Sequence, residues 1–408
     1  MEGKRYEAEP RLRFNNYNTV WEQHKLKDFF EKYQNTIYVK DDEEYRQVTV
    51  SNNGTVKYRA TTSGSKIGRK RQYAIDTDTH PLTLTFTRQN VFDGGIGFVP
   101  KELNGSIVTE NMPLLAMHDA DANFMTALFK TESYLHGVIN ENKPTGSAQK
   151  ALHEKVWLEG NVTVPSLEEQ TKIGNYFSQL DNAITLHQRK CDELKELKKY
   201  MLQNMFPKKG SNNPIIRFEG FTDAWEQRKC GDFATESSEK GHNGADAKKL
   251  TVKLHTKGIY EADEKTQGSD NTQYYVRHAG QFIYGKQNFF NGAIGVVPEN
   301  LEKYESTKDV PAFDIDESVN VEWFYQYMAR PEIYKPQELN CTGTGSKRFH
   351  VNNFLDMDIP TPSYEEQTKI GNYFSQLDHA ITLHQRKFDE LKELKKYMLQ
   401  NMFPKGRA

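Results

Sequence analysis

The sequence predicts a mixed α/β protein in which two globules alternate with two long helices that pair with each other in antiparallel fashion. Three observations support this prediction. At 408 residues the chain exceeds what one hydrophobic core usually supports. A stretch of 41 residues occurs twice with almost no change. The segments outside that stretch are also related to each other, but they have diverged much further.

The near-exact repeat covers residues 168–208 and 365–405, which lie 197 positions apart. The first copy reads EEQTKIGNYFSQLDNAITLHQRKCDELKELKKYMLQNMFPK, and two positions differ in the second: Asn182 against His379 and Cys191 against Phe388. A serine and a glutamate three residues apart stand at the start of each run. This spacing is typical of a capping box, in which the serine oxygen accepts an N–H and the glutamate reaches back to the cap. The pairs are Ser166 with Glu169 and Ser363 with Glu366, and Pro207 and Pro404 are expected to end the helices.

Apolar residues recur at steps of three and four along each copy, a pattern that predicts a coiled-coil seam. In the first copy they are Ile173, Phe177, Leu180, Ile184, Cys191, Leu194, Met201 and Met205. Each helix would be about 57 Å long at about 1.5 Å per residue. We expect the two helices of one chain to pair, because each has an apolar partner in the other. A coiled coil between two chains is the alternative.

The diverged repeat relates the segments outside the helices. Arg13, Phe14 and the Trp21–Gln23 tripeptide recur 204 positions later, and residues 88–100 align with residues 286–298. We expect the two repeated tryptophans, Trp21 and Trp225, in the cores. The predicted domains are two related globules at residues 1–165 and 211–362, followed by long helices within residues 166–210 and 363–408.

The unequal divergence predicts two kinds of binding. Two near-identical helices offer the same surface twice, so they could bind two copies of one partner with pseudo-twofold symmetry. Two diverged globules on a rigid spacer could read two different half-sites of duplex DNA, with unread bases between them.

The order of globules and helices, the two EEQTKIGNYFSQLD…DELKELKKYMLQNMFP helices and the Gly-Ser pair before each helix (146–147 and 345–346) resemble the DNA specificity subunit of type I restriction–modification systems. The resemblance implies that the globules are target-recognition domains, each reading half of a bipartite, asymmetric DNA sequence. It implies that the helices form an antiparallel spacer that docks two methyltransferase (M) subunits, to which two restriction (R) subunits are added. S-adenosylmethionine, ATP and Mg²⁺ would be bound by those partner subunits and none of them by this chain.

The sequence carries no motif for chemistry of its own. An amino-methyltransferase would need an Asn/Asp-Pro-Pro-Tyr/Phe element, yet no Pro-Pro pair occurs, and the G-x-x-x-x-G-K-[ST] loop of ATP-binding proteins is also missing. The glycines within 94–97 and 292–295 are too few for a dinucleotide fingerprint and fit a tight strand-to-strand turn. The histidines and the three cysteines lack metal-ligand spacing. We therefore expect a non-catalytic protein that binds no metal or cofactor itself.

No apolar run is long enough for a membrane span, and the N-terminal residues are charged, so a cytoplasmic protein without membrane contact is expected. The net charge of −2 does not exclude DNA binding, because phosphate contacts act within about 10 Å.

Candidate DNA-binding residues follow from base chemistry: Arg or Lys suits guanine, Asn or Gln suits adenine, and other cations contact phosphates. The aligned triplets before the glycine turns fit this chemistry: Arg88, Gln89 and Asn90, and Lys286, Gln287 and Asn288 with Asn291. A basic run adds Lys66, Arg69, Lys70 and Arg71, and the Gly-Ser elements add Ser147 and Gln149, and Ser346, Lys347 and Arg348. A solvated surface is the simpler interpretation of each group.

The predicted partner-binding face lies on the helix starts. It comprises Glu169, Gln170, Asn175 and Tyr176, repeated as Glu366, Gln367, Asn372 and Tyr373. These residues could instead cap and solvate the helices. Two other functions also stay open: a stand-alone DNA-binding regulator with tandem domains, and a coiled-coil adaptor whose globules bind protein.

Overall fold

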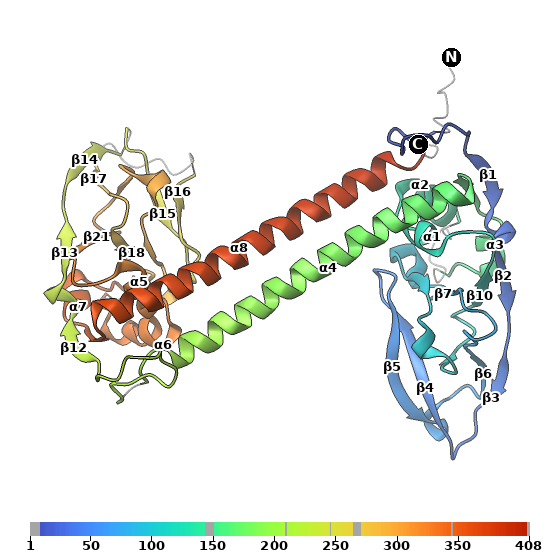
Figure 1. Ribbon diagram of the computed structural model, residues 1–408, viewed down its shortest axis with the longest axis horizontal. Coiled ribbons are helices and arrows are strands. Elements are labelled where there is room, and N and C mark those ends of the chain that lie inside the picture. Colours follow the sequence, from blue (N-terminus) through green and yellow to red (C-terminus); the bar gives the residue numbers. More distant parts are fainter. Residues whose placement is uncertain are drawn as a thin grey trace. The chain divides into compact units, whose positions relative to one another are not determined.

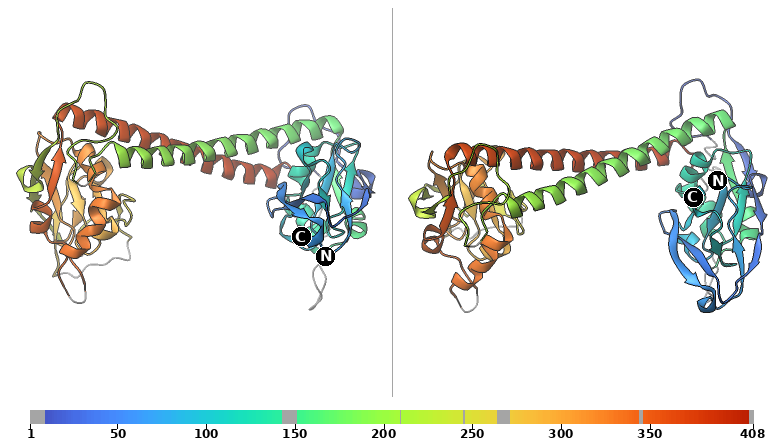
Figure 2. Two further views of the ribbon diagram at one scale, coloured as in Figure 1. Left: turned by 90° about the horizontal axis from the view of Figure 1, so that it is seen from below. Right: turned by 60° about the horizontal axis from the view of Figure 1, so that its bottom comes forward.

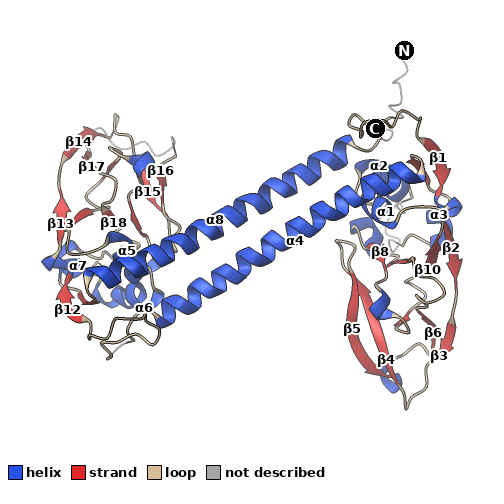
Figure 3. Cartoon of the chain, viewed as in Figure 1, coloured by secondary structure: helices blue, strands red, loops and turns tan. Residues whose placement is uncertain are grey.

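A computed structural model describes residues 9–142, 151–208, 210–244, 246–263, 271–343 and 346–405. The chain divides into two compact units: unit 1 is formed by Met1–His187 with Arg386–Ala408, and unit 2 by Gln188–Gln385. Both units combine small sheets with short helices, as the colours of Figure 3 show, so the predicted mixed α/β class is confirmed. Each unit contains one globule and a part of both long helices.

The described part of unit 1 contains three sheets, of strand order β1-β11, β2-β10-β7-β8 and β3-β6-β9-β4-β5. All their ladders are antiparallel except β4 with β9. The strands are β1 (Glu22–Lys25), β2 (Phe30–Tyr33), β3 (Thr36–Tyr38), β4 (Glu44–Val50), β5 (Val56–Ser63), β6 (Arg71–Ala74), β7 (Thr83–Phe86), β8 (Ile96–Phe98), β9 (Ile107–Val108), β10 (Leu114–Met117) and β11 (Asn161–Val164). The short helices are α1 (Ala122–Leu128), α2 (Glu132–Tyr134) and α3 (Glu154–Leu158).

Unit 2 repeats this plan, except that a three-stranded and a two-stranded sheet stand in place of the five-stranded sheet of unit 1. Its sheets have the orders β12-β22, β13-β21-β18-β19, β14-β17-β20 and β15-β16. The strands are β12 (Glu226–Lys229), β13 (Ala234–Ser237), β14 (Lys240–Asn243), β15 (Leu250–Val252), β16 (Ile259–Glu261), β17 (Gln273–Val276), β18 (Phe282–Tyr284), β19 (Ile294–Val296), β20 (Glu305–Ser306), β21 (Ala312–Ile315) and β22 (Asp358–Thr361). The short helices are α5 (Val321–Met328), α6 (Pro331–Tyr334) and α7 (Val351–Leu355).

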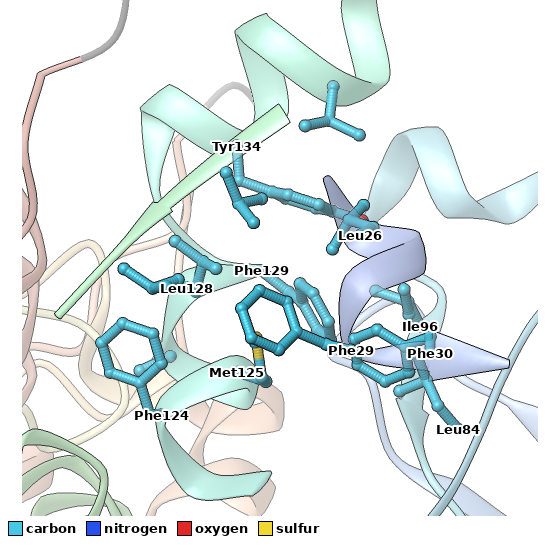
Figure 4. Packing of buried hydrophobic residues seen from close by; sticks show 14 of the residues in the cluster. Leu26, Phe29, Phe30, Leu84, Ile96, Phe124, Met125, Leu128, Phe129 and Tyr134 are labelled. Carbon is cyan, nitrogen blue, oxygen red and sulfur yellow. The ribbon is translucent and has the colours of Figure 1, made fainter. Parts of the chain in front are cut away.

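The core of unit 1 forms between α1 and the four-stranded sheet. Figure 4 shows Phe124, Met125 and Leu128 of α1 in one hydrophobic cluster with Leu26, Phe30 and Leu84. Aromatic rings dominate both cores. Trp157 contacts Phe30 at a centroid distance of 5.2 Å in unit 1, and Phe282 stacks on Phe354 at 5.5 Å in unit 2. Such rings bury large apolar areas, which stabilises globules of this modest size.

The two long helices are α4 (Leu167–Asn204) and α8 (Tyr364–Asn401), each of 38 residues, drawn green and red in Figure 1. Their starts and ends agree with the serine and proline signals in the sequence. The heptad residues at the start of each helix are buried, which confirms the predicted seam there: Ile173, Phe177 and Leu180 in α4, and Ile370, Phe374 and Leu377 in α8.

Pairing of the two helices is antiparallel within each unit. In unit 1 the first half of α4 shares a core with Leu391 and Met398 of α8, and Lys395 forms an ion pair with Asp181. In unit 2 the first half of α8 shares a core with Leu194 and Met201 of α4. There Lys198 Nζ donates to both carboxylate oxygens of Asp378 at 2.7 Å. Figure 2 shows the start of one helix beside the end of the other at each globule. The intramolecular pair is therefore confirmed.

A phenylalanine just beyond the end of each helix enters the core of a globule. In unit 1 Phe403 packs against Trp21, Phe124 and Phe177, at centroid distances of 6.0, 5.4 and 5.8 Å. In unit 2 Phe206 packs against Trp225, Tyr327 and Phe374, at 6.0, 6.0 and 5.9 Å. Both phenylalanines and both tryptophans are buried, which confirms the core position expected for Trp21 and Trp225. Each globule is thus completed by the helix that ends in it.

Replacing Phe403 with alanine should lower the free energy of unfolding of unit 1 by about 3–5 kcal/mol, because it removes a buried ring and leaves a cavity. Hydrogen exchange followed by mass spectrometry should show faster exchange in α1 and β1, and little change in α5 and β12. The matched variant Phe206→Ala should give the reverse pattern. Equal loss of protection in both units after either change would show that the two helix ends do not stabilise separate cores.

Candidate nucleic-acid interface

A tight turn joins two strands at the equivalent place in each globule. In unit 1 a 3₁₀ turn (Asn90–Asp93) lies between β7 and β8 and ends at Gly94, whose φ is +90°. In unit 2 the turn Phe289–Asn291 lies between β18 and β19 and ends at Gly292, with φ of +71°. A Cβ on Gly94 would lie 2.4 Å from the carbonyl oxygen of Asn52, so only glycine fits there. The strand-to-strand turn expected from the glycines is confirmed.

The structure brings this turn together with the segment that follows the Gly-Ser element. The N–H of Leu152 donates to the carbonyl oxygen of Arg88 in unit 1, and the N–H of Phe349 donates to that of Lys286 in unit 2, both at 2.8 Å. Phe349 also stacks on Phe289 at 4.3 Å. In unit 2 the glycine turn therefore lies next to the residues that follow the Gly-Ser element, and in unit 1 the described contact of the turn is with Leu152. Ser147 and Gln149 lie outside the described residues.

The three aligned residues of unit 1 do not share one environment. Arg88 donates to Glu154 Oε2 from Nη2 at 2.6 Å, and Lys32 donates to Oε1 at 2.5 Å. Burial alone would raise the pKa of Glu154, but the hydrogen bonds from Lys32 and Arg88 outweigh it and lower the pKa to about 2. Gln89 is partly exposed and Asn90 is exposed. Arg88 thus already has a carboxylate partner, and its contact with DNA stays a prediction.

In unit 2 the aligned lysine is available. The side chain of Lys286 makes no hydrogen bond or ion pair with any residue in the described part of the chain, and Gln287 is exposed. Asn291 donates to the side-chain oxygen of Asn288 at 3.1 Å, which orders the turn. Lys286 is therefore the better candidate of the two aligned cations for a contact with DNA.

The basic residues after the second Gly-Ser element lie beside this turn. Arg348 pairs with Asp309 at 3.1 Å, and the carbonyl oxygen of Asp309 accepts from the N–H of Lys286. Lys347 pairs with Glu338 at 2.7 Å, and Ser346 is exposed. These ion pairs lie at the surface, where they stabilise little, so both cations could exchange their partners for phosphates.

The basic run of unit 1 lies on the five-stranded sheet. Arg69 pairs with Glu110, Lys70 pairs with Asp41, and Arg71 lies over the ring of Tyr73 at 5.6 Å. Lys66 is exposed and makes no hydrogen bond or ion pair with another described residue. The carbonyl oxygen of Asn111 accepts a hydrogen bond from the N–H of Arg88. Because Asn111 follows Glu110, the partner of Arg69, this segment connects the basic run with the glycine turn.

The predicted partner face divides into buried and exposed residues. Glu169 is 0% exposed and accepts two hydrogen bonds of 2.7 Å from Arg13, and Glu366 does the same with Arg217. The glutamates therefore pair with arginines instead of reaching back to the helix caps, which corrects the capping-box expectation. Ser363 keeps its half of the motif, accepting the N–H of Glu366 at 3.4 Å.

The glutamines tie each helix start to its globule. Gln170 donates to the carbonyl oxygen of Pro165 and accepts from the N–H of Asp121, and Gln367 is placed equivalently. Asn175 and Asn372 are exposed, and Tyr176 and Tyr373 are partly exposed. All eight assignments to a partner stay predictions, and the four asparagine and tyrosine side chains are the ones within reach of a second protein.

The structure also shows exposed apolar residues on both long helices that were not predicted from the sequence. Leu186, Leu197 and Tyr200 are 53%, 41% and 56% exposed, and their repeats Leu383, Leu394 and Tyr397 are 56%, 41% and 55% exposed. Residues 11 and 14 positions apart fall close to one face of a helix with 3.6 residues per turn. We call these residues the apolar stripe of α4 and the apolar stripe of α8. The signal was a second apolar period, offset from the heptad seam.

Within the residues that the structure describes, no cluster of three His, Cys, Asp or Glu side chains is placed to hold a metal ion. Among the same residues, none of the helices combines the length and the apolar character that crossing a bilayer requires.

Comparison with known proteins identifies one family twice along the chain. The family model for the type I restriction modification DNA specificity domain matches residues 18–196 and again residues 223–393. The crystal structure of the type I restriction–modification system S subunit from M. genitalium is similar over 98% of this chain and 100% of its own, with a TM-score of 0.59 and 14% identity. The HsdS subunit from Thermoanaerobacter tengcongensis matches over 94% of this chain and 96% of its own, with a TM-score of 0.45 and 16% identity.

Arg88→Ala and Lys286→Ala should separate a structural cation from an available one. Arg88→Ala should lower the free energy of unfolding by about 2 kcal/mol, because it leaves the buried Glu154 with one cation. Glu154 has a lowered folded pKa, so its pairing stabilises the protein above the ordinary value of 4.5 and stops doing so as pH falls toward about 2. Denaturant titrations should therefore show a smaller effect of Arg88→Ala at pH 3 than at pH 7. Lys286→Ala should leave stability unchanged and weaken DNA binding; comparable losses of stability in the two variants would contradict this distinction.

Proposed function

Because the chain belongs to the family of type I restriction modification DNA specificity domains, we propose that it reads a bipartite, asymmetric DNA sequence with one half-site for each globule. The single observation that supports this most strongly is the double match of the family model. The first match includes the globule of unit 1 and the second that of unit 2. A duplicated reader whose copies have diverged suits two half-sites of different sequence.

The surfaces that would meet the bases differ between the units. The glycine turn presents the Arg88–Glu154 pair in unit 1 and, in unit 2, Lys286, which has no side-chain partner among the described residues. Phosphate contacts position a protein on DNA, and contacts with base edges specify the sequence. Two globules with one scaffold and different polar groups at the same place could therefore bind duplex DNA alike and read it differently.

The duplicated helices support docking of two methyltransferase subunits. The apolar stripe of α4 and the apolar stripe of α8 consist of identical residues with nearly equal exposure. Exposed apolar patches can mark protein interaction sites, and here the same apolar residues are exposed on both helices. One partner surface could therefore bind each helix, and two restriction subunits would join through these partners.

Chemistry is proposed to lie in the partners. The methyltransferase subunits would bind S-adenosylmethionine, and the restriction subunits would bind ATP with Mg²⁺. This chain would supply sequence recognition and assembly without a catalytic group of its own.

Exchange of residues 1–165 for those of a relative should change one half-site and leave the other as it was, since each globule has its own core and its own surface. The complex should be expressed in a host without other adenine methyltransferases, and methylated adenines should be mapped by long-read sequencing. Change in both half-sites would contradict separate reading.

The same measurements distinguish two other functions. A chain that binds its site but gives no methylation with its neighbouring methyltransferase would be a stand-alone regulator. A chain whose weak DNA binding is insensitive to salt would be an adaptor.

A further inference from the structure

One stretch of unit 1 is strongly cationic. Residues 45–75 contain seven Lys and Arg and no Asp or Glu, whereas the equivalent residues 247–277 contain six cations and four acidic residues. The ladders establish the equivalence, because Gln47 of β4 pairs with Ile107, and Lys249 in unit 2 pairs with Glu305. The cationic stretch forms most of β4, all of β5 and β6, and the connections between them.

A β-bulge interrupts the ribbon that β4 forms with β5. The ladder runs from Val50 with Val56 to Val48 with Tyr58, and then continues from Gln47 with Ala60. Arg59 is the extra residue that this shift leaves without a partner across the ribbon. Bulges re-aim a side chain and increase the local twist of a strand.

The same position in unit 2 has no extra residue. There Leu250 of β15 pairs with Glu261 of β16, and the next pair follows at once, since Ala262 N–H donates to the carbonyl oxygen of Lys249 at 2.9 Å. The bulge and the cation that it carries, Arg59, thus have no counterpart at this position of the unit 2 ribbon.

Three cations of the stretch are available at the surface. Lys57, Arg59 and Lys66 are exposed, and none of them forms a hydrogen bond or ion pair with another residue in the described part of the chain. The other four are engaged: Arg46 with the carbonyl oxygen of Glu102, Arg69 with Glu110, Lys70 with Asp41, and Arg71 with the ring of Tyr73. The inner face of the ribbon is anchored by the buried Val48, Val50 and Val56.

Edge protection explains only part of this arrangement. β5 is an edge strand of the five-stranded sheet, and charged residues on an edge prevent pairing with other chains. Lys57 and the bulge itself both serve that role, because a bulge twists an edge away from other chains. Edge protection does not require the displaced residue to be an arginine, or a stretch of 31 residues to lack any carboxylate.

We propose that the β4–β5 ribbon of unit 1 lies in the major groove of one half-site, where the bulge directs Arg59 to a base edge and Lys57 and Lys66 contact phosphates. The inference rests on the proposed function and adds the element and the residue that read the sequence. A two-stranded ribbon fits the major groove, which is about 12 Å wide, and arginine binds the O6 and N7 atoms of guanine with two hydrogen bonds. The half-site read by unit 1 therefore contains a guanine that Arg59 recognises.

The test uses the full chain in complex with its methyltransferase. Arg59→Ala should relax one base position in one half-site of the methylated sequence and weaken binding of the cognate duplex by about 10- to 100-fold at fixed salt. Arg59→Lys should also relax that position, because lysine keeps the charge but not the two-pronged geometry. Lys57→Ala should weaken cognate and unrelated duplexes equally and lower the slope of log affinity against log salt by about 1.

Lys101→Ala, an exposed cation of the same globule outside the basic stretch, is the matched control and should change neither sequence nor affinity. An unchanged methylated sequence in Arg59→Ala would overturn the inference. A uniform loss of affinity without relaxation at any base would also overturn it, since Arg59 would then contact phosphate. Failure of the proposed function is distinguishable, because the unaltered chain would then direct no methylation to any bipartite sequence.

Discussion

The architecture depends on one packing constraint: each globule is completed by the end of a long helix that comes from elsewhere in the chain. Phe403 enters the core of unit 1 beside Trp21, and Phe206 enters the core of unit 2 beside Trp225. A buried ring of this kind contributes about 3–5 kcal/mol, a large part of the stability of an ordinary domain. The end of a long helix therefore cannot separate from its globule without partly unfolding the core of that globule.

Polar contacts at both ends of the helix pair add geometric precision to this packing. Arg13 donates two hydrogen bonds of 2.7 Å to the buried carboxylate of Glu169, and Arg217 donates two of the same length to Glu366. Lys395 with Asp181 and Lys198 with Asp378 fix how the helices lie side by side within each unit. The carboxylates of Glu169 and Glu366 are buried, and leaving either without its arginine would be costly, so these two pairs hold each helix start against its globule. These four ion pairs form two equivalent sets, one in each unit, whereas the sheets that carry β4 and β15 differ. Ile107 of unit 1 corresponds to Glu305 of unit 2, and the side chain of Glu305 accepts one hydrogen bond of 2.7 Å from the backbone N–H of His242.

The two long helices and their apolar seams could be predicted from the sequence, because both follow from the spacing of residues that are close together in the chain. The ends of α4 and α8 and the turns at Gly94 and Gly292 followed from local signals. The partners of charged residues did not. Glu169 looked like a capping and docking residue, yet its carboxylate binds an arginine 156 positions away. Arg88 looked like a base reader, yet it binds a glutamate 66 positions away. Contacts over such separations depend on the tertiary fold, which periodicity does not specify. The bulge at Arg59 was equally hidden, since one extra residue in a strand leaves no mark in a single sequence.

The central claim is that a duplicated helix presents one docking surface twice, while two diverged globules read DNA. Native mass spectrometry of the chain co-expressed with its neighbouring methyltransferase tests this claim most directly, because it counts subunits without assuming where they bind. Two methyltransferase subunits per copy of this chain are predicted, one for each apolar stripe. A complex that stays at one methyltransferase per chain with the partner in excess, or a chain recovered alone while still binding its DNA, would contradict the claim.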